Sequence, residues 1–451
     1  MNPPVQQERI KRLNNKHNIK GSYVIYWMQA SQRCEYNHAL EFAIYTANLL
    51  LLPVIVYFGL TNQFPEANER HYRFMLQGLK DTSASLNQRG ILFILRHESP
   101  EKGIVELSRN ASAVITDRGY LKIQKAWRTH VAASVQCPVI QVESDVIVPV
   151  EQASLKEEYS AATLRKKITK HIQKYIVPIS ELEPEVSSLH LNLETINLAN
   201  TDKLLAKLNV DKSVKRSAIF SGGTSEAKKL LKQFIEMKLI SYAMSKSDPG
   251  LDYTSHLSPF LHFGQISPLF IALEVLKSDS NGKDTYLEEL ITRRELSMNF
   301  VNYNTMYDSF DSIPVWARKT FQEHEKDKRD FLYTVEEMEN ARTHDKYWNA
   351  AQREMTITGY MHGYMRMYWC KKIIEWSQLP SEAYRTALYL NNKYELDGRD
   401  PNGFTGIAWS FGKHDRPWAI RSIFGNVRYM SSEGLKRKFD IDRYVQRINA
   451  L

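Results

Sequence analysis

Hydroxyl side chains gather in residues 253–267, just ahead of an apolar run with helical spacing. Thr254, Ser255 and Ser258 lie within five positions of one another. Hydroxyl groups together with the free backbone N–H groups at a helix start can bind an anion such as a diphosphate. The same residues could serve only as a helix cap, and the residue types alone favour the cap.

A second segment carries an acidic and a basic residue at helical spacing. Glu289 and Arg293 are four positions apart, so a regular helix places them on one face. If that face lines a cavity, Glu289 can hydrogen-bond a polar ligand. If the face is exposed, the two residues form a surface pair worth about 0.3–0.5 kcal/mol, and the residues alone favour this alternative.

A third segment places large apolar side chains around one arginine. Met365, Trp369, Ile373 and Trp376 share one helical face. Such a stripe is more typical of core packing than of a cofactor site. Arg366, however, is a cation in an apolar helix and requires an acidic partner or a ligand.

Residues 394–409 combine three acidic residues, an arginine and an asparagine with three glycines and a proline. This composition is typical of a tight polar loop that holds a ligand. An exposed turn would not need the apolar Phe404, Ile407 and Trp409 that accompany it. We therefore expect a ligand-binding loop here.

The whole chain has the composition of a folded protein with two or three domains. It has 451 residues, of which 43% are hydrophobic and 25% charged, which excludes disordered, collagen-like and coiled-coil classes. The N-terminus lacks an apolar signal core and the chain lacks a long uncharged apolar run, so we expect a soluble intracellular protein without membrane contact. Three widely spaced cysteines predict neither a disulfide framework nor a metal site.

Net charge points to an anionic partner. The chain carries a net charge of +9, and residues 413–447 hold nine basic and four acidic residues, a local net charge of +5. Nucleic acid is the commonest partner of such a stretch, although a solvated basic surface is the plain alternative.

Two domains and a linker must position these residues. Residues 1–145 alternate strands and helices and predict a doubly wound, five-stranded parallel sheet, with strands expected at 23–28, 52–58, 91–95, 113–117 and 139–142. No dinucleotide fingerprint or Walker loop accompanies this pattern. Residues 146–224 are less periodic and predict a long linker. Residues 225–451 predict a mostly helical domain.

Taken together, these segments closely resemble class II cyclobutane pyrimidine dimer photolyases of the photolyase/cryptochrome superfamily. The resemblance covers nearly the whole chain and is carried by residues 254–267, 348–350, 361–369, 395–403, 428–430 and 436–439. It implies an α/β domain, a linker and a helical FAD-binding domain. It also implies a deoxyribodipyrimidine photo-lyase that acts as a monomer on UV-damaged DNA, with FADH⁻ as the active cofactor and an antenna chromophore left open.

The resemblance also implies roles in cofactor binding. Thr254, Ser255, Ser258 and the backbone of Leu257 would hold the FAD diphosphate, and Tyr242 would contact FAD. The polar loop would surround the flavin, with each role assigned by resemblance: Arg366 paired with Asp397 beside the ring, Asp400 at its polar edge, and Asn402 near N5, where it would stabilise the reduced form.

Electron transfer and DNA binding are assigned in the same way. Trp369 and Trp348 would relay electrons to FAD, with Trp376 as an auxiliary donor. Glu289 would hydrogen-bond the damaged thymines in a dry pocket, and Arg293 would also contact the substrate. Residues expected to contact the flipped dimer or the DNA phosphates are Met367, Trp418, Arg428, Lys436, Arg437 and Lys438.

The resemblance implies a mechanism in which excited FADH⁻ passes an electron to the flipped dimer, the cyclobutane ring splits, and the electron returns. Fused pyrimidines stack poorly, so flipping them costs less than flipping normal bases. Three alternatives stay open: a cryptochrome-like photoreceptor without repair, a dark flavin oxidoreductase, and a DNA-binding module.

Overall fold

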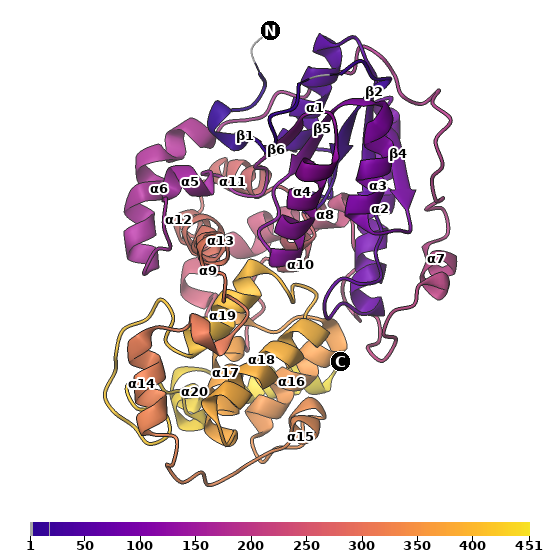
Figure 1. Ribbon diagram of the computed structural model, residues 1–451. Helices are drawn as coiled ribbons and strands as arrows, with labels where there is room; N and C mark the ends of the chain where they lie inside the picture. The colour runs from indigo at the N-terminus through magenta and orange to yellow at the C-terminus, as the bar shows by residue number, and fades with distance from the viewer. Residues whose placement is uncertain (1–2, 18) are drawn as a thin grey trace.

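The computed structural model describes residues 3–17 and 19–451. A sheet with flanking helices forms the N-terminal part, and a larger helical part packs below it in Figure 1. Among the described residues, no helix combines the length and apolar character needed to cross a membrane.

The described residues form one sheet with the strand order β1-β6-β5-β2-β3-β4. Its strands are β1 (Ile10–Arg12), β2 (Tyr23–Trp27), β3 (Val54–Gly59), β4 (Leu92–Arg96), β5 (Ala111–Asp117) and β6 (Val139–Val142). The five predicted strands are present and parallel, which confirms the doubly wound prediction. The sheet grows in both directions from β2, so the topological switch point lies between β2 and β5.

The sequence analysis missed β1, which pairs antiparallel with β6. This strand has only three residues and no apolar alternation, so it carries no periodic signal. Its position is fixed by the preceding residue. The buried Arg9 guanidinium donates to the backbone carbonyls of Glu143, at 3.1 Å, and Val146, at 3.0 Å.

Helices cover both faces of the sheet because its strands are buried on both sides. They are α1 (His38–Leu49), α2 (Glu69–Gln88), α3 (Pro100–Leu107) and α4 (Lys122–Ser134), with short 3-10 turns at Gln7–Arg9 and Ser108–Asn110. The expected alternation of strands and helices is therefore present. Asn37 and Asn68 cap α1 and α2 through their side chains.

The segment predicted as a linker holds α5 (Val150–Ala153), α6 (Ala161–Tyr175) and α7 (Thr201–Lys207). Helix α6 was not predicted. Its Leu164 and Ile168 are buried in the same apolar cluster as Phe260 and Leu290 of the helical part. Between α6 and α7 the chain follows the outer edge of β4, where the Ile196 N–H donates to the Leu95 carbonyl at 2.8 Å.

The helical part contains the helices α8 (Thr224–Gln233), α9 (Leu239–Ser245), α10 (Ser258–His262), α11 (Pro268–Leu276), α12 (Lys283–Leu287), α13 (Arg294–Tyr303), α14 (Val315–Glu323), α15 (Val335–Glu339), α16 (Lys346–Thr358), α17 (Gly363–Trp376), α18 (Pro380–Tyr394), α19 (Pro401–Ser410), α20 (Ser432–Lys438) and α21 (Ile441–Asn449). Two π-helical segments, η3 (Phe234–Lys238) and η4 (Glu288–Arg293), join neighbouring helices, and a 3-10 turn spans Phe310–Ser312.

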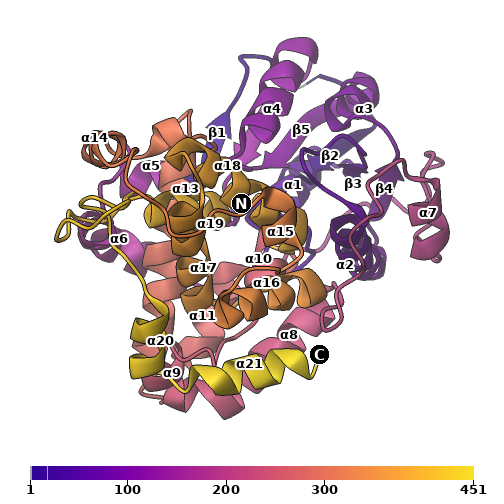
Figure 2. The ribbon, with the colours of Figure 1, turned by 90° about the horizontal axis from the view of Figure 1, so that it is seen from below.

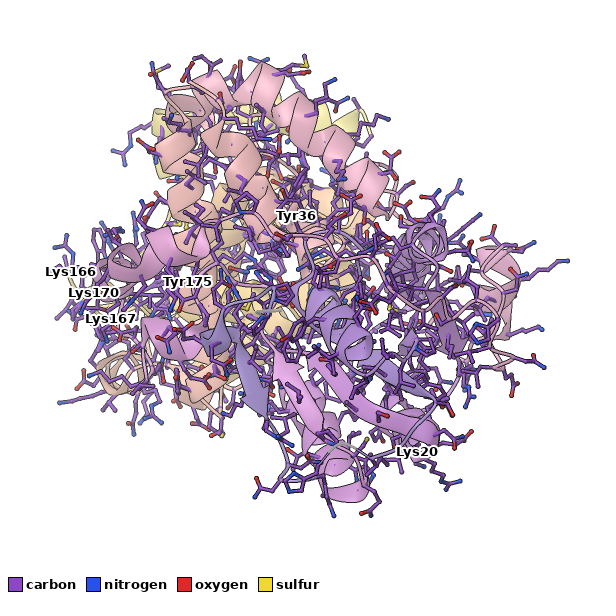
Figure 3. The ribbon with its side chains drawn as sticks, turned by 90° about the horizontal axis from the view of Figure 1, so that it is seen from above. Lys20, Tyr36, Lys166, Lys167, Lys170 and Tyr175 are labelled. Atoms are coloured by element: carbon purple, nitrogen blue, oxygen red, sulfur yellow. The ribbon has the colours of Figure 1, made fainter. Side chains whose placement is uncertain are left out.

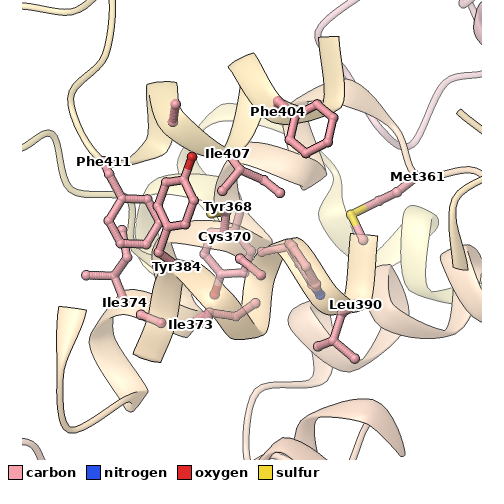
Figure 4. Packing of buried hydrophobic residues seen from close by; sticks show 14 of the residues in the cluster. Met361, Tyr368, Cys370, Ile373, Ile374, Tyr384, Leu390, Phe404, Ile407 and Phe411 are labelled. Carbon is pink, nitrogen blue, oxygen red and sulfur yellow. The ribbon is translucent and has the colours of Figure 1, made fainter. Parts of the chain in front are cut away.

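Helix α17 runs through the middle of this part. Its apolar side chains pack with those of α18 and α19, as Figure 4 shows for Tyr368, Ile373, Tyr384 and Ile407. All four residues of the predicted stripe, including both tryptophans, are at most 3% exposed. The stripe therefore forms core, and any electron-transfer role is additional to packing.

Candidate active site

A cavity of about 330 Å³ lies among η4, α13, α17 and α19. It brings together residues that are far apart in the sequence. Six of the site residues expected from the sequence line it: Glu289, Arg293, Arg366, Met367, Trp369 and Asn402. Its size falls within the usual range for ligand sites. We call it the catalytic cavity below.

Arg366 holds two carboxylates at the wall of the catalytic cavity. Its Nη2 lies 3.0 Å from Asp397 Oδ1 and 3.0 Å from Glu395 Oε2, and its Nε donates to the Met361 carbonyl at 2.9 Å. Burial raises the pKa of Glu395 well above its usual value, although Arg366 opposes this shift. Glu395 lines the cavity, and its Oε1 has no partner among the described residues.

Asp400 and Asn402 form the start of α19. Asp400 Oδ1 accepts from the Asn402 backbone N–H and from its side-chain amide, both at 2.8 Å, while Oδ2 lies 3.1 Å from His262 Nδ1. Burial opposes ionisation of Asp400, but the contact with His262, the charge of Arg294 and the Asn402 N–H together outweigh it and lower the pKa of Asp400. The Asp400 carboxylate therefore fixes the amide of Asn402 at the edge of the cavity.

The hydroxyl cluster lies outside the lining of the catalytic cavity. Thr254 Oγ accepts from the Tyr360 hydroxyl at 3.0 Å, and Ser255 Oγ accepts from the Tyr286 hydroxyl at 3.2 Å. Ser258 begins α10 and does not cap it through its side chain. Its Oγ is buried without a partner among the described residues, and Leu257 beside it is buried as well. A helix-cap role thus leaves the Ser258 hydroxyl unexplained.

Glu289 and Arg293 both line the cavity, and they do not form the surface pair that was the other alternative. Residues 288–293 form the π-helix η4, whose bonds join residues five apart, so the four-residue spacing no longer aligns them. Arg293 Nε instead lies 3.6 Å from Glu288, and Glu289 pairs with Lys246. The Glu289 side chain is 39% exposed, so its carboxylate does not occupy the dry pocket that we expected.

Sequence analysis missed two of these partners, Lys246 and Glu395. Lys246 follows α9 and lies four residues after Tyr242. Tyr242 itself is buried outside the cavity lining, and the centres of its ring and the Tyr286 ring are 5.3 Å apart. The sequence could have indicated Lys246 because it is a basic residue close to Tyr242, the residue expected to contact FAD. Glu395 belongs to the polar loop, and its position two residues before Asp397 pointed to it.

Three tryptophan rings form a continuous row that leads away from the catalytic cavity. Trp369 lines the cavity and stacks on Trp348, with ring centroids 6.2 Å apart and planes within 7°. Trp348 in turn packs edge-on against Trp376, with ring centroids 5.5 Å apart. The indole of Trp369 donates to Gln352 at 2.8 Å, which fixes the first ring of the row. Trp376 borders a shallow surface pocket beside Tyr333.

The residues expected to contact DNA lie on the surface near the cavity. Trp418 is 38% exposed, and the guanidinium groups of Arg416 and Arg428 lie 5.3 Å and 4.8 Å from the centre of its ring. Exposed basic side chains follow on α20, and they are Lys436, Arg437 and Lys438. Trp418 lies outside the lining of the cavity, whereas the half-buried Met367 belongs to it.

A second cavity lies between the sheet and the helical part, and we call it the interdomain cavity. Trp27, Gln29 and Gln32 line it, together with Arg399 from the helical part. Each of the first three has a buried polar atom without a partner among the described residues: Trp27 Nε1, Gln29 Nε2 and Gln32 Oε1. The backbone N–H groups after β2, at the adjacent switch point, cannot bind a ligand because they already donate to the Asp117 carboxylate.

Comparisons with known proteins identify the family. Residues 24–185 match the DNA photolyase family model. A protein of Methanothermobacter thermautotrophicus named deoxyribodipyrimidine photo-lyase is 51% identical over 448 residues, which are 99% of both chains.

Two solved structures share the fold. A bacterial class III photolyase from Agrobacterium tumefaciens has a TM-score of 0.75 at 18% identity, over 95% of this chain and 87% of that one. An archaeal photolyase from Sulfolobus tokodaii, solved with two FAD molecules, has a TM-score of 0.72 at 16% identity, over 94% and 89% of the two chains. With the full-length relative above, these findings show that the chain belongs to the DNA photolyase family of lyases.

Proposed function

We propose that the protein repairs cyclobutane pyrimidine dimers in UV-damaged DNA by light-driven electron transfer from reduced FAD. The observation that carries this proposal is the row of Trp369, Trp348 and Trp376. Its inner ring lines the same cavity as Glu289 and Asn402. A donor row, a charged cofactor wall and an opening for a ligand thus meet in one place.

The residues of the helical part fit FAD. The buried, unpartnered Ser258 hydroxyl, with Thr254, Ser255 and the Leu257 backbone, would bind the diphosphate. Arg366, held by Asp397, would face the isoalloxazine, with Asp400 at its polar edge and Tyr242 beside the cofactor. The two FAD molecules of the Sulfolobus tokodaii photolyase, which has the same fold, support this assignment.

When bound and reduced, FAD would supply the photoexcited electron, and the chain supplies placement and polarity. Asn402 is oriented by Asp400 and would place its amide against the ring. The tryptophan row would deliver electrons from the surface to keep the cofactor reduced. Because the three rings are at most 3% exposed, water is excluded from the path.

The opening of the catalytic cavity would receive the flipped dimer. Glu289 at the rim would hydrogen-bond the thymine carbonyl edge through the O–H of its carboxyl group, and the lesion itself would displace the water that now reaches this group. Arg293 and Met367 line the same opening. Trp418, which has Arg416 and Arg428 beside its ring, would stack on the lesion or on a neighbouring base.

The interdomain cavity would hold an antenna chromophore if one is used. Its lining is aromatic, and the unpartnered atoms of Trp27, Gln29 and Gln32 offer two donors and one acceptor. Its volume is about 100 Å³, so the two parts of the protein would have to move apart to admit a flat ligand. The Sulfolobus tokodaii photolyase, with its two FAD molecules, implicates a light-harvesting cofactor in that protein. Extraction of a second chromophore from the purified protein, lost in Gln29→Leu, would test this assignment.

The test of the main proposal is repair of an oligonucleotide carrying one thymine dimer. We expect dimer loss under blue light and none in darkness. The double variant Glu289→Ala with Trp418→Ala should lose repair but keep photoreducible flavin. The variant Trp348→Phe should do the reverse, losing photoreduction while repairing DNA when its flavin is reduced chemically.

The matched control is Trp316→Phe, a tryptophan on α14 outside the row. It should leave both activities unchanged. Bound, photoreducible flavin without any repair in the unmodified protein would contradict the proposal and favour a photoreceptor. Lesion binding by a protein without flavin would favour a DNA-binding module.

A further inference from the structure

Helix α6 carries a concentration of positive charge in the segment that was predicted to be a linker. Between Ala161 and Tyr175 it has one arginine, four lysines and no acidic residue, a net charge of +5. Residues 413–447 have the same net charge over more than twice the length. The basic surface of the protein therefore has a second centre outside the C-terminal segment.

The basic side chains of α6 divide into two groups. Three are paired with carboxylates of neighbouring segments: Arg165 with Glu288, Lys167 with Glu158, and Lys174 with Glu8. Lys166 and Lys170 are exposed and have no ion pair or hydrogen bond among the described residues. Figure 3 shows both projecting outward from the helix, whereas Tyr175 lies against the body of the protein. The nearby acids are thus already neutralised, and the outer face of α6 stays positive.

Helix α6 begins at the edge of the catalytic cavity. Ala161, its first residue, lines that cavity, and Arg165 ties the helix to η4 next to Glu289. Just before the helix, the Tyr159 hydroxyl donates to the Asp415 carbonyl at 3.0 Å, in the loop that leads to Trp418. In Figures 1 and 2, α6 and this loop lie on the same side of the molecule, and α7 lies on the opposite side.

We propose that Lys166 and Lys170 bind the phosphate backbone of the DNA beside the lesion. The proposal rests on the proposed function, since it assumes that DNA approaches the catalytic cavity. The two lysines are one turn apart, about 6 Å along the helix axis. Along one strand of duplex DNA a phosphate follows about every 3.4 Å of the axis, so each of the two lysines can reach a phosphate. An acidic protein could bind the same positive charge, but the position of α6 at the rim of the catalytic cavity favours DNA.

The test compares two double variants in salt-dependent DNA binding. Lys166→Gln with Lys170→Gln removes the proposed contacts. Lys203→Gln with Lys207→Gln removes two exposed lysines at the same spacing on α7, on the far side. Fluorescence anisotropy with undamaged and dimer-containing duplexes, from about 50 to about 200 mM salt, gives the affinity and its log–log slope.

We expect the α6 variant to lose about 1.8 from the magnitude of the slope, because each phosphate contact contributes about 0.9. Its affinity should fall roughly ten-fold at about 0.1 M salt, while the α7 variant stays close to the unmodified protein. The light-driven repair rate of a dimer duplex bound at saturation should be unchanged in the α6 variant. Lys166 and Lys170 are exposed, so thermal unfolding should be the same in all three proteins.

Two results would overturn the proposal. One is an unchanged slope in the α6 variant, and the other is an equal change in both variants, which would mean that only net charge matters. If the unmodified protein repairs no dimers but the α6 variant still lowers the slope, the proposed function fails and the DNA contact stands. If the unmodified protein repairs dimers and the α6 variant leaves the slope unchanged, the proposed function stands and the DNA contact fails.

Discussion

The two cavities of the protein differ in the charges of the side chains that line them. The catalytic cavity is lined by the carboxylates of Glu289 and Glu395 and by the guanidinium groups of Arg293 and Arg366. The lining of the interdomain cavity, as far as the structure describes it, has aromatic rings, amides and histidines but no carboxylate. Its one guanidinium, that of Arg399, is turned to the Asn392 carbonyl, at 2.5 Å.

Under the proposed function, this difference would separate two kinds of binding. Fixed charges in a low-dielectric wall favour one charge state and one orientation of a ligand, which is what a reacting group requires. A neutral aromatic wall holds a ligand by contact area and a few hydrogen bonds, which suits a group that only has to be placed. The doubly wound sheet would offer a ligand site at its switch point, but Asp117 fills that place with protein contacts.

The largest expected effect is the removal of the central charge of the catalytic cavity. Arg366→Met leaves the buried Asp397 carboxylate without its cation, so we expect a loss of about 3–5 kcal/mol in the free energy of unfolding. The variant should also lose bound flavin. Chemical denaturation and the visible spectrum of the purified protein measure the two effects.

Arg353→Met on the neighbouring α16 is the matched control, since Arg353 is exposed. It should change the free energy of unfolding by less than about 0.5 kcal/mol and keep the flavin. Equal stability of Arg366→Met and this control would mean that the carboxylates beside Arg366 are neutral, and the charged description of the cavity would fail.

A smaller effect should come from Lys371, which lies behind the cavity wall. Its ammonium is fully buried, donates to the Ser410 carbonyl and lies 5.6 Å from the Trp409 ring, without an acidic partner among the described residues. Burial lowers its pKa to about 7. Between about pH 7 and pH 10.4 the unfolded chain then binds more protons than the folded one, so stability rises with pH in this window.

Below about pH 7 the full cost of charging Lys371 is present. Lys371→Met should therefore be more stable than the unmodified protein at about pH 6, by about 2–3 kcal/mol after loss of its hydrogen bond, and the advantage should shrink towards about pH 10. Urea unfolding at several pH values measures this. The exposed Lys319→Met on α14 should show no such trend. A pH-independent difference for Lys371→Met would show that Lys371 stays charged throughout.

The charged cavity was easier to predict from the sequence than its detailed geometry. The five parallel strands were visible as apolar runs, and the residues of the polar loop near Asp397 were found because a tight acidic loop next to tryptophans is unusual. The pairing of Glu289 failed because nothing in a local pattern signals a π-helix. Helix α6 was missed because its apolar residues are sparse, and a run of lysines by itself is equally typical of an exposed linker.

The interdomain cavity left almost no sequence signal, for a physical reason. Trp27 lies in a strand whose other residues are also buried, so its unpartnered Nε1 is invisible until β2 is placed against the helical part. Gln29 and Gln32 are common loop residues with no spacing rule. A site of neutral groups contributed by separate elements is defined only by the tertiary structure.

The smallest effect should come from this neutral cavity and would complete the contrast. Gln32→Leu removes an amide whose Oε1 is already unpartnered and whose Nε2 makes only a long contact of 3.4 Å to the Gln29 carbonyl. Replacing a poorly satisfied buried amide by an apolar group of similar shape should change the free energy of unfolding by less than about 1 kcal/mol, in either direction. Flavin content and dimer repair under direct excitation should be unchanged. A loss of several kcal/mol, or of flavin, would mean that the interdomain cavity supports the catalytic cavity through the packing between the two parts. The two cavities would then be one coupled unit, and the division into a charged reactive site and a neutral holding site would not stand.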